Sequence, residues 1–117
     1  MRYGVLIVDD NSGFRSRARE LLESEGFEVV GEAADADSAL AATRELVPDV
    51  VLLDVQLPGL DGFEVAKQLT SNGQAPTVVL ISSHDVTDFG SLVRASGAHG
   101  FIAKHELSGE RLRSLLA

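Results

Sequence analysis

The chain has 117 residues, of which 44% are apolar, and this is enough for one packed domain but too little for two ordinary cores. It contains no cysteine, which excludes disulfides and thiolate metal sites. The formal net charge of -8 argues against direct nucleic-acid binding, because affinity for DNA depends largely on Lys and Arg side chains that neutralise phosphates.

No stretch of the chain approaches the roughly 20 consecutive apolar residues that a membrane-spanning helix needs. The N-terminus also lacks the long apolar region and the small-residue cleavage site of a secretory signal peptide. We therefore expect a cytoplasmic protein that does not contact a membrane.

Short apolar runs alternate along the chain with longer segments that carry apolar residues at helical spacing. The elements expected in the first half are a strand over 5–8, a helix from Asn11 or Ser12 to Gly26, a strand over 27–31, and a helix from Asp35 or Asp37 to Pro48. Asn, Ser and Asp side chains favour helix N-termini, whereas Gly and Pro end helices. The inner faces of the two helices are expected to carry Phe14, Ala18, Leu21 and Leu22, and Ala39, Leu40, Thr43 and Leu46.

The second half of the chain repeats this alternation. Its expected elements are a strand over 50–53, a turn at Pro58-Gly59, a helix over 61–69 that Asn72-Gly73 stops, a strand over 77–81, a helix over 85–96, a strand over 101–103 and a helix over 108–115. The run over 50–53 contains no polar residue, which is typical of a strand buried on both faces of a parallel sheet. Gly90 weakens the helix over 85–96, because glycine is a poor helix former.

Five strand–helix units in succession predict an α/β fold. Right-handed crossovers place helices on both faces of a parallel sheet, and five units suit the doubly wound, flavodoxin-like strand order 2-1-3-4-5. The sequence shows no linker, low-complexity segment or second domain, so we expect one domain over residues 1–117.

Polar side chains follow four of the five expected strands, at the edge of the sheet where ligands bind in such folds. They are Asp9 and Asp10 after the first strand, Asp54 after the third, Ser82 and Ser83 after the fourth, and Lys104 after the fifth. The strand order predicts that these side chains converge on one rim.

The three carboxylates of this rim would repel one another if they were left unpaired. Each close pair costs on the order of 4 kcal/mol at ~4 Å and an effective dielectric constant near 20. A hard divalent cation removes this repulsion, and Mg²⁺ prefers oxygen ligands. The expected ligands are Asp9, Asp10, Asp54 and the backbone carbonyl of Gln56, with water completing the coordination.

Lys104 and Ser82 each have a structural and a functional interpretation. Lys104 could form a simple salt bridge to Asp54, or it could clamp a transferred phosphoryl group. Ser82 could cap the end of its strand, or it could donate a hydrogen bond to a phosphoryl oxygen. Because an acid pair, a single Asp, a hydroxyl and an ammonium each end a different strand, the combination favours the functional interpretations.

This combination resembles the receiver domains of bacterial two-component response regulators over essentially the whole chain. The resemblance is carried by Asp9-Asp10 in VLIVDDN, Asp54 in PDVVLLDVQLPGLDGFE, Ser82 in VVLISSH and Lys104 in GFIAKHE. Each motif is weak alone, but together and at these spacings they are highly specific. The tail GFIAKHELSGERL is most similar to the LuxR/NarL-like helix-turn-helix subfamily.

The resemblance implies that Asp54 is the phosphoacceptor and that Asp9 and Asp10 hold Mg²⁺ with it, with Mn²⁺ as a possible substitute. It also implies that Lys104 and Ser82 bind the phosphoryl group. The donor would be the phosphohistidine of a sensor histidine kinase. The domain would be a regulatory phosphoacceptor rather than an enzyme, with self-phosphorylation and self-dephosphorylation as its only activities.

Three further positions follow from the same resemblance. Phe101 matches an aromatic switch residue that turns inward when Ser82 moves toward the phosphoryl group. Ser83 matches a position that is small, so that the donor can approach the phosphoryl-binding site. His105 stands where the family usually has a proline after the lysine, which makes the geometry of this loop harder to predict.

The resemblance also implies partners. We expect a DNA-binding output domain that is missing from this chain, and homodimer formation on phosphorylation. The chain itself should not bind nucleic acid, since it is acidic and contains no basic helix. A single-domain receiver, or a pseudo-receiver that docks without being phosphorylated, is the alternative.

Two other classes of protein are disfavoured by named residues. A haloacid-dehalogenase-type phosphatase would need a second Asp at the position of Gln56. A flavodoxin would need a phosphate-binding loop rich in Ser, Thr and Gly where Asp9 and Asp10 stand. His84 lies two residues beyond Ser82 and could influence access of water, although a solvated loop histidine is the simpler interpretation; the remaining histidines, His99 and His105, are expected at the surface.

Overall fold

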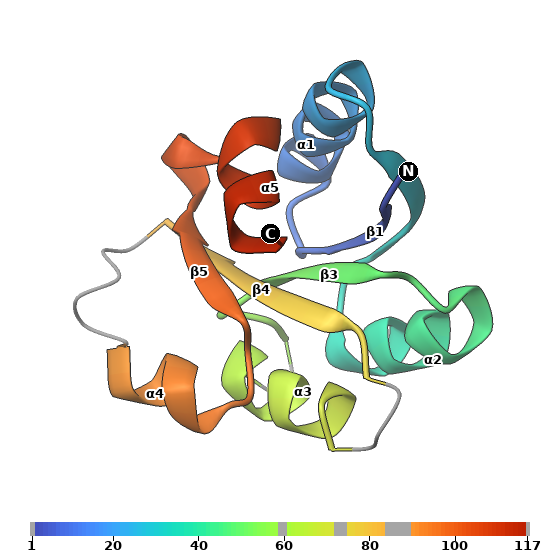
Figure 1. Ribbon diagram of the computed structural model, residues 1–117. Helices are drawn as coiled ribbons and strands as arrows, with labels where there is room; N and C mark the ends of the chain where they lie inside the picture. Colours follow the sequence, from blue (N-terminus) through green and yellow to red (C-terminus); the bar gives the residue numbers. More distant parts are fainter. Residues whose placement is uncertain (1, 59–60, 72–74, 84–89, 117) are drawn as a thin grey trace.

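The structure is a computed structural model that describes residues 2–58, 61–71, 75–83 and 90–116 (Figure 1). Five parallel strands form one sheet in the order β2-β1-β3-β4-β5, as the sequence predicted. The strands are β1 (Gly4–Val8), β2 (Glu28–Ala33), β3 (Val50–Asp54), β4 (Thr77–Ser82) and β5 (Gly100–Ala103).

Helices cover both faces of the sheet. They are α1 (Ser12–Ser24), α2 (Ala36–Leu46), α3 (Gly62–Leu69), α4 (Gly90–Ala95) and α5 (Gly109–Leu116), with a short 3-10 turn, η2 (Lys104–Glu106), between β5 and α5. In Figure 1, α1 and α5 lie on one side of the sheet, and α2, α3 and α4 lie on the other. No helix within the described residues has the length and apolar character required to span a bilayer.

Two apolar clusters, one on each face, hold these layers together. All residues of β1 and β3 are buried, and their side chains alternate between the faces. Val5 and Ile7 pack with residues of α1 and α5, whereas Leu6 and Val8 pack with residues of α2 and α3. Each buried aliphatic side chain contributes about 1.5–3 kcal/mol, so the central strands are the most strongly held part of the fold.

Local hydrogen bonds explain where three helices begin. Asn11 Oδ1 accepts from the N–H of Phe14 at 3.0 Å and caps α1. Asp35, rather than Asp37, caps α2 through a reciprocal pair of hydrogen bonds with Ser38. Asp61 caps α3 with a single hydrogen bond, which its Oδ1 accepts from the N–H of Glu64 at 2.9 Å. These caps satisfy N–H groups that have no partner inside the helix.

The structure differs from the prediction at the ends of several elements and in the burial of one helix residue. The second strand was expected to end at Gly31, but β2 continues to Ala33 because Glu32 and Ala33 pair with the last residues of β1. Leu46 was expected on the inner face of its helix, but it is 43% exposed, since it lies at the last turn of α2 over Gly31. Val47 then ends the helix with a left-handed backbone, φ 46.

Several predictions fall wholly or partly outside the described residues. The turn at Pro58-Gly59, the helix stop at Asn72-Gly73 and the expected start of the helix over 85–96 are among them. Within the described residues, α4 covers the second half of that helix.

Candidate functional site

The structure brings the three predicted carboxylates together at the carboxyl ends of β1 and β3. One oxygen from each of Asp9, Asp10 and Asp54 lies within 4.8 Å of the others. Asp9 is completely buried and Asp54 is 5% exposed, whereas Asp10 is exposed. The grouping follows from topology, because β1 and β3 are hydrogen-bonded neighbours although 45 residues separate their ends in sequence.

Asp9 is fully buried, and only one of its two carboxylate oxygens accepts a hydrogen bond from a described residue. Its Oδ1 accepts a hydrogen bond from the N–H of Asn11 at 2.9 Å. Its Oδ2 lies 2.5 Å from Lys104 Nζ, but this contact does not have the alignment of a hydrogen bond, and no other described residue donates to Oδ2. The Lys104 ammonium already balances the charge of this buried oxygen, so a metal ion bound here would share the carboxylate with Lys104.

Each carboxylate oxygen of Asp54 has a hydrogen-bond partner. Its Oδ1 accepts from the N–H of Gln56 at 3.1 Å, and its Oδ2 lies 3.3 Å from Lys104 Nζ. Burial raises the pKa of the Asp54 carboxyl group, and the nearby Asp9 charge adds to this effect, while the Gln56 N–H and the Lys104 ammonium oppose it. In the absence of a metal ion the net direction is upward, toward the protonated form.

Lys104 stands directly after β5 and reaches back across the sheet edge to both buried carboxylates. Burial disfavours its charge, but its contacts with Asp9 and Asp54 outweigh this and raise the pKa of the ammonium. The predicted salt bridge to Asp54 is therefore present, but it is shared with Asp9, which is the closer partner.

The donor set of this site fits a hard divalent cation. Three carboxylates supply oxygen ligands from one small region, and among the described residues the Lys104 ammonium pairs with only two of them, Asp9 and Asp54. Mg²⁺ needs few protein oxygens because it retains several waters. The chain thus has an acidic pocket with the chemistry that Mg²⁺ requires.

The backbone around Asp54 is also constrained by α3. The N–H of Gly62 donates to the carbonyl of Val55 at 2.8 Å. A Cβ on Gly62 would lie 2.3 Å from the carbonyl oxygen of Asp54, so only glycine fits. Sequence reasoning missed this contact, although a glycine directly after the helix cap Asp61 was a signal of close approach.

The predicted switch residues Ser82 and Phe101 lie on β4 and β5, which stand on the opposite side of β3 from β1. Ser82 is buried at the end of β4, and Ser83 follows it in an exposed position. Phe101 lies on β5 opposite Leu80 and packs partly buried against the cluster beneath α2 and α3. His99 and His105 are exposed, as expected for surface residues, whereas His84 lies outside the described residues.

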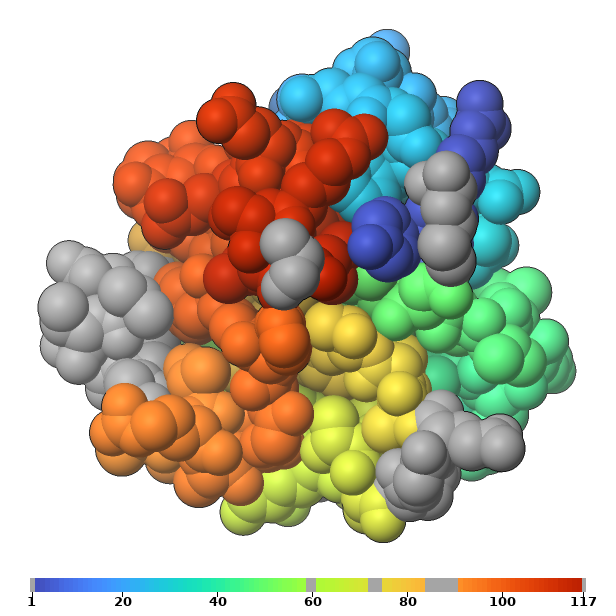
Figure 2. Space-filling view, viewed as in Figure 1, coloured from blue at the N-terminus to red at the C-terminus, as the bar shows by residue number. Residues whose placement is uncertain are grey.

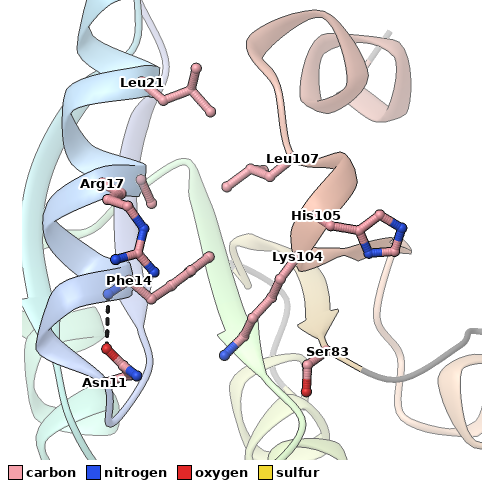
Figure 3. Close-up of a pocket in the computed structure, with 9 residues that line it drawn as sticks. Asn11, Phe14, Arg17, Leu21, Ser83, Lys104, His105 and Leu107 are labelled. Carbon is pink, nitrogen blue, oxygen red and sulfur yellow. Dashed lines mark hydrogen bonds between the residues drawn. The ribbon is translucent and has the colours of Figure 1, made fainter.

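A pocket of about 520 Å³ opens between α1 and the segment after β5 (Figure 3). Its lining consists of Asn11, Phe14, Arg17, Ala18, Leu21, Ser83, Lys104, His105 and Leu107. Lys104 Nζ lies 4.7 Å from the centre of the Phe14 ring. The sequence placed Phe14 on an apolar helix face and gave no indication of this contact.

Comparison with known proteins agrees with this arrangement. Residues 5–117 match the sequence profile of the response regulator receiver domain. The chain belongs to the response regulator receiver family. The receiver resemblance predicted from the strand-end motifs is therefore confirmed, and so is the five-stranded fold.

Several of the curated relatives are transcription or DNA-binding regulators. The chain is 41% identical over 102 residues to the virulence-factor transcription regulator BvgA of Bordetella pertussis, covering 87% of this chain and 49% of the relative. It is 40% identical over 106 residues to the DNA-binding response regulator MtrA of Mycobacterium leprae, covering 89% of this chain and 45% of the relative. The receiver thus spans about half the length of these proteins.

Solved structures of LuxR and NarL type are similar over nearly the whole receiver. The signal receiver domain of the response regulator NarL from Mycobacterium tuberculosis superposes with a TM-score of 0.87 at 34% identity, covering 99% of this chain and 98% of that one. A two-component response regulator of the LuxR family from Aurantimonas sp. gives a TM-score of 0.88 at 30% identity, covering 99% and 84%. These matches agree with the similarity of the tail to the LuxR/NarL-like subfamily.

Proposed function

We propose that this chain is the phosphoryl-accepting domain of a two-component system and that Asp54 is its phosphoacceptor. The observation that carries the proposal is the convergence of Asp54 with Asp9, Asp10 and Lys104 at the carboxyl edge of the sheet. Asp54 ends β3, the strand next to β1, and it shares the Lys104 ammonium with Asp9, the first residue after β1.

The transfer is a displacement at phosphorus. An oxygen of Asp54 attacks the phosphorus of a kinase phosphohistidine, and the new O–P bond forms as the P–N bond breaks. The imidazole leaves with the electron pair of that bond and takes up a proton from solvent. Hydrolysis of the aspartyl phosphate by water later returns the carboxylate and releases inorganic phosphate.

The residues around Asp54 hold the reacting groups and balance their charge. Lys104 would pair with the phosphoryl oxygens, and Ser82 would donate to one of them; the ion pair of Lys104 with Asp54 and the location of Ser82 at the end of β4 support these roles. Ser83 leaves room for the donor because its side chain is small. Positioning and charge neutralisation of this kind account for most of the catalysis in phosphoryl transfer.

Asp9, Asp10 and Asp54, with the backbone carbonyl of Gln56, are the groups that we assign to Mg²⁺, with Mn²⁺ as a substitute. The ion would neutralise charge on the phosphoryl oxygens and on the carboxylates when it is bound. The support for this assignment is the oxygen donor set, whose three carboxylates outnumber the one ammonium, that of Lys104, which pairs with them among the described residues.

The signal would leave the site through β4 and β5. Ser82 and Phe101 lie on these neighbouring strands, and we assign them the role of a coupled switch. Parts of α4, β5 and α5 form one continuous stretch of the surface in Figure 2, in orange to red. This surface is where a change at Asp54 would reach a partner.

The relatives suggest what that partner is. Because the chain spans about half of relatives named as transcription or DNA-binding regulators, we propose that a DNA-binding output domain accompanies it in the native protein. Phosphorylation by a sensor histidine kinase in the cytoplasm would then promote homodimer formation or change contact with that domain. Residues 1–117 act in this scheme as one receiver domain that does not itself touch DNA.

A direct test uses acetyl phosphate as a small phosphodonor. With Mg²⁺ present, intact-protein mass spectrometry should show the addition of one phosphoryl group, and removal of the metal with EDTA should abolish it. A chain that gains no mass with donor and Mg²⁺ would instead be a pseudo-receiver that works by docking alone.

A further inference from the structure

We propose that Phe14 is a positioning residue for Lys104, and that its ring face holds the Lys104 ammonium beside Asp9 and Asp54. The ring centre lies 4.7 Å from Lys104 Nζ, within the range of about 6 Å in which a cation is attracted to an aromatic face. Figure 3 shows the two side chains reaching toward each other from opposite walls of the pocket. This inference rests on the proposed function of the site.

The position of Phe14 is fixed by the same turn that fixes the acidic pair. Asp9 Oδ1 accepts from the N–H of Asn11, and Asn11 Oδ1 accepts from the N–H of Phe14. These two hydrogen bonds connect the carboxylate and the aromatic residue through the start of α1. The ring is partly buried and packs against the apolar cluster beneath α1 and α5. Its location relative to Asp9 is therefore determined locally.

Lys104 needs such a support because its side chain is long and flexible. Holding a lysine side chain in one place costs up to about 2 kcal/mol of rotamer entropy. Asp9 and Asp54 hold the ammonium when they are free, but both are also proposed ligands of Mg²⁺. A metal ion shared between these carboxylates weakens their attraction for Lys104.

An aromatic ring is suited to this task in a way that a further carboxylate is not. The ring attracts the ammonium through its quadrupole, but it carries no net charge and is not a ligand for Mg²⁺. Phe14 thus steadies Lys104 without competing for the metal ion. Among the described residues that line the pocket, Phe14 is the only aromatic carbocycle.

The competing explanation is that Phe14 only fills the wall of the pocket with Leu21 and Leu107. In that case any apolar side chain of similar size would serve. The two explanations differ in their response to Phe14→Leu, which keeps the apolar volume and removes the ring, and to Phe14→Tyr, which keeps the ring.

The experiment measures the rate of phosphorylation by acetyl phosphate at saturating Mg²⁺, together with Mg²⁺ affinity. We expect Phe14→Leu to slow phosphorylation roughly 2- to 5-fold, the range that a weak cation–π contact implies, and Phe14→Tyr to keep the rate of the wild type. Mg²⁺ should bind Phe14→Leu at least as tightly as the wild type. A Lys104 ammonium that is held less firmly beside Asp9 and Asp54 repels the metal ion less. Leu21→Ala, which alters the same pocket wall without touching Lys104, is the control and should leave the rate within about twofold.

Three results would overturn the proposal: equal rates in all variants, equal slowing by Phe14→Leu and Phe14→Tyr, or weaker Mg²⁺ binding in Phe14→Leu, which would indicate general damage to the site.

An NMR measurement without a phosphodonor tests the Phe14–Lys104 contact independently of whether the site accepts a phosphoryl group. The Lys104 Cε protons should show an upfield NMR shift from the ring that persists in Phe14→Tyr and is lost in Phe14→Leu. If the wild type accepts no phosphoryl group but this shift pattern holds, the proposed function fails while the Phe14–Lys104 contact stands; an absent shift refutes the contact itself.

Discussion

At the scale of single residues, the proposed role of Asp54 requires an ionised carboxylate, whereas its environment is buried. Burial raises the pKa of its carboxyl group, and Asp9 adds to the effect. Lys104 and the Gln56 N–H act in the opposite direction. A bound divalent cation would favour the ionised form further, so that the nucleophile becomes available where the metal ion is present.

This environment predicts how stability depends on pH without a metal ion. A raised carboxyl pKa means that the folded state binds the proton more tightly than the unfolded state, so Asp54 reduces stability as the pH rises through the unfolded and then the folded pKa. Asp54→Asn removes this effect. The variant should be more stable than the wild type at pH 7 in EDTA, with the difference shrinking in acid. Urea unfolding at several pH values is the measurement, and a variant less stable at pH 7 would contradict the account.

At the scale of elements, the segment from β3 to α3 shows a close approach that the sequence pattern alone did not reveal. Gly62 N–H bonds to the Val55 carbonyl, and a Cβ at Gly62 would collide with the Asp54 carbonyl oxygen. The first residue of α3 is thus in close contact with the backbone of Asp54, the proposed phosphoacceptor.

Gly62→Ala should therefore damage both the fold and the site. Backbone atoms must shift to admit the methyl group, and we expect a loss of about 1–3 kcal/mol in the free energy of unfolding, together with weaker Mg²⁺ binding. Gly13→Ala in α1 is the matched control, because its Cβ would meet only the side chains of Asn11 and Arg17. The control should be neutral or slightly stabilising, since alanine favours a helix. Equal stability of the two variants, measured by urea unfolding, would show that the α3 contact is unimportant.

Much of the element structure could be predicted because the signals are local. Apolar runs gave the strands, and Asn11, Asp35 and Asp61 marked helix starts that their own side-chain hydrogen bonds explain. The convergence of the carboxylates followed from the strand order. The extension of β2 to Ala33 depends on pairing with β1, which no local pattern encodes. The Gly62 and Phe14–Lys104 contacts were also missed, because they join separate segments through tertiary packing.

At the scale of the whole molecule, the two central strands are anchored in both apolar clusters, while the proposed switch lies toward one edge of the sheet. Ser82 is at the end of β4, and Phe101 is on β5, the edge strand next to it. An edge strand with one neighbour can adjust without disturbing the central strands. This arrangement suits a surface that responds to a charge added at Asp54.

Ser82→Ala should separate phosphorylation from this response. The variant still carries Asp54, Lys104 and the acidic pair, so it should accept a phosphoryl group. The variant lacks the hydroxyl that we propose donates a hydrogen bond to the phosphoryl group. NMR shift changes at Phe101 and α4 should therefore be smaller than in the phosphorylated wild type. Shift changes of wild-type size in fully phosphorylated Ser82→Ala would show that the coupling follows another route.

The central claim is that the phosphoryl group is carried by Asp54, and chemical mapping tests it most directly. The chain is treated with acetyl phosphate and Mg²⁺, reduced with borohydride, which converts an aspartyl phosphate to homoserine, and digested for peptide mass spectrometry. The account predicts homoserine at position 54 alone, and neither phosphorylation nor reduction in Asp54→Asn. Homoserine at Asp9 or Asp10 in the wild type, or full phosphorylation of the Asp54→Asn variant, would contradict it.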